Sequence, residues 1–205
     1  MKIQHLFVAT IMVLVSGCAV NLPPLNFSVP NVGLSQHKID AELKSMTVAV
    51  ARNDEKTGAL DFKYANFGDH KSSESLNTQM VLQQWQTALQ ESINNMAIFQ
   101  DDATKKVNLS VKILKLDITS LFGPIKVTAT EARYEIIDRK SGDLIFTQNI
   151  TSTGEVNSMV TMNGPASVKE SINKSVQNNI QQFLQALETV DFKKPMFPAK
   201  VGERK

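Results

Sequence analysis

Residues 131–148 read EARYEIIDRKSGDLIFTQ, and this stretch decides the fold. Apolar and polar residues alternate on both sides of a short polar segment, residues 139–143, that contains a glycine. Alternation with a period of two is typical of strands with one buried face, and a Gly-containing turn between two such runs predicts a β-hairpin. We therefore expect antiparallel strands over residues 125–138 and 144–156.

Two further segments show strand periodicity. Residues 107–118 alternate, but the pattern shifts phase at Leu114 and Leu116, as a β-bulge would make it. Residues 43–51 also alternate, with Met46, Val48 and Val50 on one face. In the strand over residues 125–138, the apolar positions are Val127, Ala129, Ala132, Tyr134 and Ile136.

Apolar residues spaced three and four apart predict two helices. The first covers residues 74–99, with Ser73 or Ser75 as candidate N-caps. Its apolar stripe is Leu76, Met80, Leu82, Trp85, Leu89, Ile93 and Met96. The second covers residues 165–190 and opens with Pro165, which a first turn tolerates. Its stripe is Val168, Ile172, Val176, Ile180, Phe183, Leu184 and Leu187.

The element order is therefore β-α-β-β-β-α. It predicts an α+β two-layer sandwich: a mostly antiparallel sheet of about four strands, with both amphipathic helices on its apolar face. We expect residues 42–190 to form one globular domain, with a long polar loop over residues 52–73 and a second loop over residues 157–164.

The N-terminus has the features of a bacterial lipoprotein signal peptide over residues 1–17. Lys2 precedes an apolar run, residues 6–15, that is too short to span a bilayer, which needs roughly 20 apolar residues. Val15-Ser16-Gly17-Cys18 then resembles a lipobox, which predicts cleavage before Cys18 and acylation of its thiol. An ordinary secretory signal with a chance cysteine is the alternative.

Residues 18–41 are expected to be the lipidated N-terminus and a tether, because prolines and asparagines interrupt both periodicities. Fully extended, a tether of this length reaches on the order of 75 Å. Leu22, Leu25, Phe27 and Val29 alternate, however, so part of it is alternatively a strand of the domain. Residues 191–205, with two prolines and a basic surplus, are expected to be a mobile C-terminal tail.

Composition and motifs argue against several classes of function. The chain is 42% hydrophobic and 20% charged, as in ordinary globular proteins. Loss of the signal peptide, with its single lysine, lowers the formal charge from +2 to +1, which gives no electrostatic reason to expect nucleic acid binding. Once Cys18 is acylated, the mature chain has no free thiol for a disulfide or a metal site.

Neither mature histidine, His37 or His70, stands in a metal-binding or catalytic-triad motif, and no phosphate-binding glycine loop is present. We therefore predict no metal, no cofactor and no enzymatic activity. The close carboxylate groups, Asp101 with Asp102 and Glu131 with Glu135, are the candidates for a hydrolase of sugar polymers. We interpret them instead as a connection and as the solvent face of a strand.

Exposed apolar residues are candidate contacts for a partner protein. They lie in the loop after the hairpin, in the turn at residues 121–124 and in the tail, and are Met159, Val160, Met162, Phe122, Phe192 and Phe197. For the two loops, closing the edges of the core is an alternative role.

Together, the lipobox, the Pro-containing tether and a β-α-β-β-β-α domain with the residue 131–148 hairpin resemble small Gram-negative outer-membrane lipoproteins of the YajG and ABC-type transport auxiliary group. The architecture is also similar to the lipopolysaccharide-assembly lipoprotein that plugs its barrel partner. The resemblance covers residues 14–190, and only the lipobox is a specific motif. It implies an envelope accessory role without catalytic residues.

The leading hypothesis is a non-enzymatic lipoprotein on the periplasmic face of the outer membrane. It would be anchored through Cys18 and would bind an envelope transport or assembly component. By resemblance to bacterial lipoproteins, Ala19, rather than Asp, after the cysteine implies sorting to the outer membrane. Binding of a lipid or glycan between the helices and the sheet is the second hypothesis, and a periplasmic hydrolase is the third.

Overall fold

The computed structural model describes residues 25–51, 78–118, 123–161 and 164–192. In chain order the elements are β1 (Glu42–Val50), α1 (Thr78–Met96), β2 (Lys106–Ile118), β3 (Ile125–Asp138), β4 (Leu144–Asn157), α2 (Ser158–Thr161) and α3 (Gly164–Leu187). The predicted α+β fold and its element order are confirmed, apart from the additional short helix α2. The signal peptide, Cys18, the loop over residues 52–73 and the candidate N-caps lie outside the described residues.

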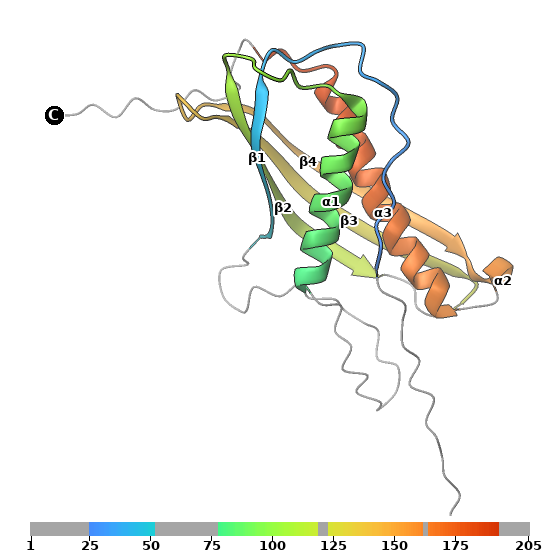
Figure 1. Ribbon diagram of the computed structural model, residues 1–205. Coiled ribbons are helices and arrows are strands. Elements are labelled where there is room, and N and C mark those ends of the chain that lie inside the picture. Colours follow the sequence, from blue (N-terminus) through green and yellow to red (C-terminus); the bar gives the residue numbers. More distant parts are fainter. Residues whose placement is uncertain (1–24, 52–77, 119–122, 162–163, 193–205) are drawn as a thin grey trace, which may run out of the picture.

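One four-stranded sheet has the order β1-β2-β3-β4. β1 pairs with β2 in parallel, whereas β2–β3 and β3–β4 are antiparallel, so the sheet is mostly antiparallel as predicted. The register between β2 and β3 shifts between Ile113 and Lys115, which confirms the bulge at Leu114. Both long helices lie on one face of the sheet (Figure 1), with α1 beside β1 and α3 over β3 and β4.

The core fills the space between the helices and the sheet. Its largest fully buried side chains include Trp85 of α1, Tyr134 of β3 and Phe183 of α3. The Tyr134 and Phe183 rings are stacked, with centroids 4.1 Å apart. Burial of these aromatic side chains is a main apolar contribution to stability. Met80, predicted to lie on the buried stripe of α1, is instead 37% exposed near the start of that helix.

In the first half of β3, the buried face differs from the face predicted from the sequence. Its alternation is unbroken, so Thr128 and Thr130 face α3, whereas Val127 and Ala129 lie on the opposite face. The Thr128 Oγ1 lies 2.8 Å from Ser171 Oγ, and the Thr130 Oγ1 lies 2.6 Å from Ser175 Oγ. Buried hydroxyl groups are tolerated where they find such partners. The helix and the sheet therefore meet here through paired hydroxyls.

Residues 25–41 do not form the expected tether. Leu25 and Phe27 are buried, and the Phe27 ring contacts Trp85 edge-on. The alternation of this segment was correctly recognised, but the segment packs in extended form against the helices and adds no strand to the sheet. Only Ile39 makes a β-bridge, to Phe99. The packed domain thus begins no later than residue 25.

Candidate functional site: a charged groove at the hairpin end

Four segments meet around a groove of about 850 Å³ at the end of the sheet where the β3–β4 hairpin turns. They are residues 37–40, residues 104–106, residues 138–140 and the chain that leaves α3, residues 187–192. The apolar residues of its lining are Ile39, Leu187, Val190 and Phe192, and the lining also includes charged side chains. The groove is therefore assembled from parts of the chain that are distant in sequence.

The hairpin turn is held by Asp138 at the end of β3. One oxygen of its carboxylate accepts hydrogen bonds from the backbone N–H groups of Lys140 (2.7 Å) and Ser141 (3.1 Å). The Ser141 hydroxyl accepts a hydrogen bond from the N–H of Asp143 at 3.2 Å. Gly142 has a φ of 78°, a conformation that glycine adopts without strain. This local bonding holds the turn as one wall of the groove.

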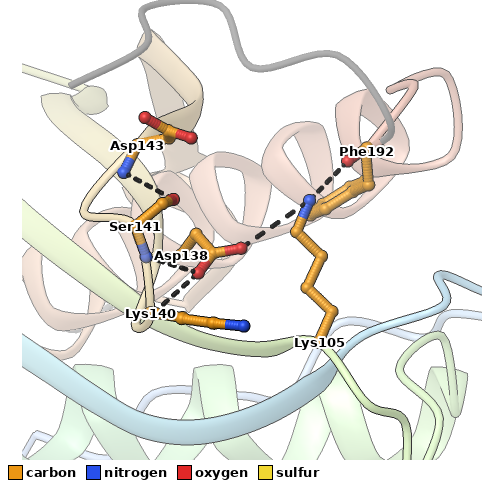
Figure 2. A network of polar contacts seen from close by, with 6 residues as sticks. All are labelled: Lys105, Asp138, Lys140, Ser141, Asp143 and Phe192. Carbon is orange, nitrogen blue, oxygen red and sulfur yellow. Dashed lines mark hydrogen bonds and ion pairs between the residues drawn. The ribbon is translucent and has the colours of Figure 1, made fainter. Parts of the chain in front are cut away.

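Lys105 joins the hairpin to the C-terminal segment (Figure 2). Its ammonium group donates a hydrogen bond to the carbonyl of Phe192 at 2.7 Å and lies 3.9 Å from the second carboxylate oxygen of Asp138. The Phe192 ring packs edge-on against Phe99, with centroids 6.4 Å apart. A single lysine thus connects the turn to the end of the described chain.

Phe192 corrects a sequence prediction. We expected it to be a tail aromatic with no core to fill, but its side chain is 8% exposed and belongs to the hydrophobic core. The reason is that the ring packs edge-on against Phe99, while the Phe192 carbonyl accepts the hydrogen bond from Lys105. Phe192 therefore helps to form the groove and is not presented on a free tail.

The charges around the groove are mixed. The basic side chains are Lys38, Lys105, Lys106, Arg139 and Lys140, and the acidic ones are Asp40, Asp138, Glu188 and Asp191. Among the described residues, the side chains of Arg139 and Lys140 form no ion pair. Lys106, by contrast, is paired with Glu42. Hydrogen bonds from Lys106, and to a lesser extent from Lys44, hold the pKa of the Glu42 carboxyl below its usual value. The groove therefore offers two uncommitted cations next to an apolar surface.

The carboxylates considered for a hydrolase do not converge on this groove. Glu131 and Glu135 lie on the solvent face of β3, where Glu135 bonds Lys112 at 3.0 Å and Glu131 accepts a hydrogen bond from Asn149 at 3.4 Å. Asp101 and Asp102 lie in the turn between α1 and β2. These positions agree with our interpretation of both pairs as structural.

Of the candidate partner contacts, Met159 is 71% exposed in α2. Phe122, Met162 and Phe197 lie outside the described residues, as does the side chain of Val160. Among the residues that are described, no group of three or more His, Cys, Asp or Glu side chains is placed to hold a metal ion. In the same part of the chain, no helix is long and apolar enough to cross a bilayer.

Sequence reasoning missed the groove because its residues carry no motif. His37, Lys38, Ile39 and Asp40 were assigned to a tether, and Phe192 to a tail. The available signal was Ile39, an isolated apolar residue between polar neighbours, which forms the bridge to Phe99. A single residue of this kind could not predict that residues 37–40 and 187–192 meet at one hairpin.

No protein-family model and no curated protein matches this chain. Among solved structures, a Xanthomonas campestris protein of the family DUF330 aligns with 13% identity over 80% of this chain and 92% of its own, with a TM-score of 0.48. A minor lipoprotein from Acinetobacter baumannii aligns with 11% identity over 72% and 92% of the two chains, with a TM-score of 0.38. At TM-scores below 0.5, these likenesses leave the function of this chain open.

Proposed function

We propose that this protein is a non-enzymatic lipoprotein of the Gram-negative cell envelope. Acyl groups on Cys18 hold it on the periplasmic face of the outer membrane, and it binds another envelope component at the hairpin-end groove. The observation that carries the proposal is the groove itself, where two uncommitted cations, Arg139 and Lys140, border an apolar surface. Such a combination suits a protein segment that has both acidic and apolar side chains.

The anchor rests on the sequence motif Val15-Ser16-Gly17-Cys18. Two or more acyl chains bind a membrane durably, whereas one chain binds marginally. The identity of the residue after the cysteine, Ala19, supports outer-membrane sorting only through the resemblance to bacterial lipoproteins.

The packing of α3 argues against a lipid or glycan site between that helix and the sheet. A Cβ atom added to Gly154 of β4 would lie 2.0 Å from the carbonyl oxygen of Ser171 and 2.4 Å from the backbone nitrogen of Ser175. Helix and strand therefore touch backbone to backbone, and a ligand would have to separate them.

Two measurements test the proposal. First, Cys18→Ser should abolish labelling by a fatty-acid analogue and release the protein from the outer-membrane fraction, whereas the wild type is labelled there. Unlabelled, soluble wild-type protein would contradict the anchor.

Second, a photo-crosslinking amino acid at Lys140 should capture one defined envelope protein in living cells. The matched control is the same amino acid at Glu91, which is exposed on α1 and does not line the groove. The adduct should weaken when Arg139→Glu is added and should be recovered when the captured protein is tagged instead. Equal adducts at positions 140 and 91 would exclude the groove as the specific site.

A further inference from the structure

Of the exposed large apolar side chains in the described segments, most lie at one end of the domain. Among the described residues, four large hydrophobic side chains are exposed: Leu34 (76%), Met80 (37%), Ile125 (43%) and Met159 (71%). Met80 lies in the first turn of α1, Ile125 begins β3, and Met159 lies in α2 just before α3. Only Leu34 lies near the other end, because its neighbour Ser35 bonds the carbonyl of Met96 at the end of α1.

Ile125 and Met159 are held close to one another. Ile125 pairs with Asn157, the last residue of β4, and the Asn157 side chain accepts a hydrogen bond from the N–H of Met159 at 3.0 Å. The Ser158 N–H donates to the carbonyl of Pro124 at 2.6 Å. Both apolar side chains are therefore fixed at the end of the sheet opposite the hairpin, where Figure 1 shows α2.

The N-terminal segment runs toward this same end. The backbone carbonyl of Val29 accepts a hydrogen bond from Gln177, while Ser28 bonds Asn173 through both its backbone N–H (2.6 Å) and its hydroxyl (2.8 Å). Val29 thus contacts residue 177 of α3, whereas Ser28, one residue earlier in the chain, contacts residue 173, which is four residues closer to the start of that helix. The segment passes antiparallel to α3, so the chain before it is directed toward α2.

The length of chain that remains before the anchor is short. Cys18 and Leu25 are seven positions apart, and seven extended residues span at most about 25 Å. Asn173 lies nine residues into α3, or about 14 Å from its start at 1.5 Å per residue. A lipid on Cys18 therefore keeps the α2 end of the domain near the bilayer.

We propose that the end of the domain carrying Met159 and Ile125 rests in the lipid surface, and that the hairpin-end groove faces the periplasm. This inference rests on the proposed acylation of Cys18. Transfer of exposed apolar side chains from water to the acyl boundary of a bilayer lowers their free energy. The two ends of β3 are thirteen residues apart, so the groove stands about 45 Å from Ile125 along the strand.

The test uses the acylated full-length mature protein in vesicles of phosphatidylethanolamine and phosphatidylglycerol. Met159→Cys and Leu34→Cys are each labelled with an environment-sensitive fluorophore. They form a matched pair because both replace a highly exposed apolar side chain and lie at opposite ends. The fluorophore at position 159 should shift its emission to the blue and lose intensity when the vesicles contain a doxyl-labelled lipid. The fluorophore at position 34 should show neither change.

Thiol labelling of the wild-type protein distinguishes the proposed anchor at Cys18 from the proposed orientation of the domain. If Cys18 is acylated, the wild type has no thiol and takes up no fluorophore, because Cys18 is the only cysteine of the chain. A labelled wild type would overturn the anchor and, with it, the orientation. An unlabelled wild type with no spectral change at position 159, or with equal changes at positions 159 and 34, would overturn the orientation alone.

Discussion

Gly154 of β4 lies directly against the carbonyl oxygen of Ser171 in α3. A side chain at this position would overlap that oxygen, since even a Cβ atom would come within 2.0 Å of it. The glycine therefore sets how closely the helix approaches the strand. This close approach also brings the Ser152 hydroxyl within 2.8 Å of the Ser175 carbonyl, to which it donates.

Gly154→Ala should consequently destabilise the domain. The added methyl group must push backbone atoms of α3 away, and overpacking of this kind typically costs about 1–3 kcal/mol, occasionally more. Urea unfolding of the variant and the wild type measures the difference. Gly33→Ala is the control, because a Cβ at Gly33 meets no atom within 4 Å, and we expect a change within about 0.5 kcal/mol. Equal stabilities of both variants would contradict the close packing.

The hydroxyl pair between Thr130 and Ser175 should be coupled. Thr130→Val removes the hydroxyl that lies 2.6 Å from Ser175 Oγ and leaves a buried polar group with fewer partners, which costs about 1–3 kcal/mol. Ser175→Ala should cost less when combined with Thr130→Val than alone, and a double-mutant cycle measures this coupling. Thr151→Val, on the solvent face of β4, is the matched control. Additive effects would show that the two hydroxyls act independently.

Stability at alkaline pH should depend on Tyr134. Burial raises the pKa of this phenol above its usual value of about 10, and its hydroxyl donates to Asn179 Oδ1 at 2.9 Å. The unfolded chain therefore ionises first as the pH rises. The contribution of Tyr134 to stability is complete below about pH 10 and is lost progressively above it.

Comparison of wild type with Tyr134→Phe measures this effect. The wild type should lose more unfolding free energy between pH 8 and pH 11 than the variant. In a Tyr64→Phe background, Tyr134 is the only tyrosine of the chain, and its absorbance at alkaline pH should change only when the protein unfolds. Titration of the folded variant near pH 10 would refute the burial.

The sequence predicted the elements that depend on local periodicity. The hairpin, the bulge at Leu114 and the buried faces of both long helices follow from spacings within one segment, because one side of each element is covered by the core. The prediction for residues 25–41 failed because the packing of this segment depends on residues that are distant in the sequence. Leu25 and Phe27 alternate like a strand, but their partners are Trp85 and other residues far along the chain. The same non-local packing hid the groove, which needs residues 37–40 and residues 187–192 to meet at the hairpin turn.

Polar residues were the other source of error. Thr128 and Thr130 face α3 because Ser171 and Ser175 supply partners, and no rule of hydrophobic alternation can anticipate a buried hydroxyl pair. The pattern instead favoured Val127 and Ala129, which lie on the solvent side. Serines at positions 167, 171 and 175 share one face of α3, and this spacing was the signal that was overlooked.

The C-terminal boundary of the domain is tested by two truncations. Removal of residues 193–205 leaves Phe192 in the core, whereas removal of residues 191–205 deletes it together with the carbonyl that Lys105 binds. Loss of a buried phenylalanine side chain typically costs about 3–5 kcal/mol, so the longer truncation should unfold at clearly lower urea concentration. The shorter truncation should unfold near the wild-type midpoint.

Phe192→Ala in the full-length protein separates loss of the ring from loss of the backbone, because it keeps the carbonyl for Lys105. If this variant is as stable as wild type, the contact between Phe192 and Phe99 contributes nothing to the stability of the domain.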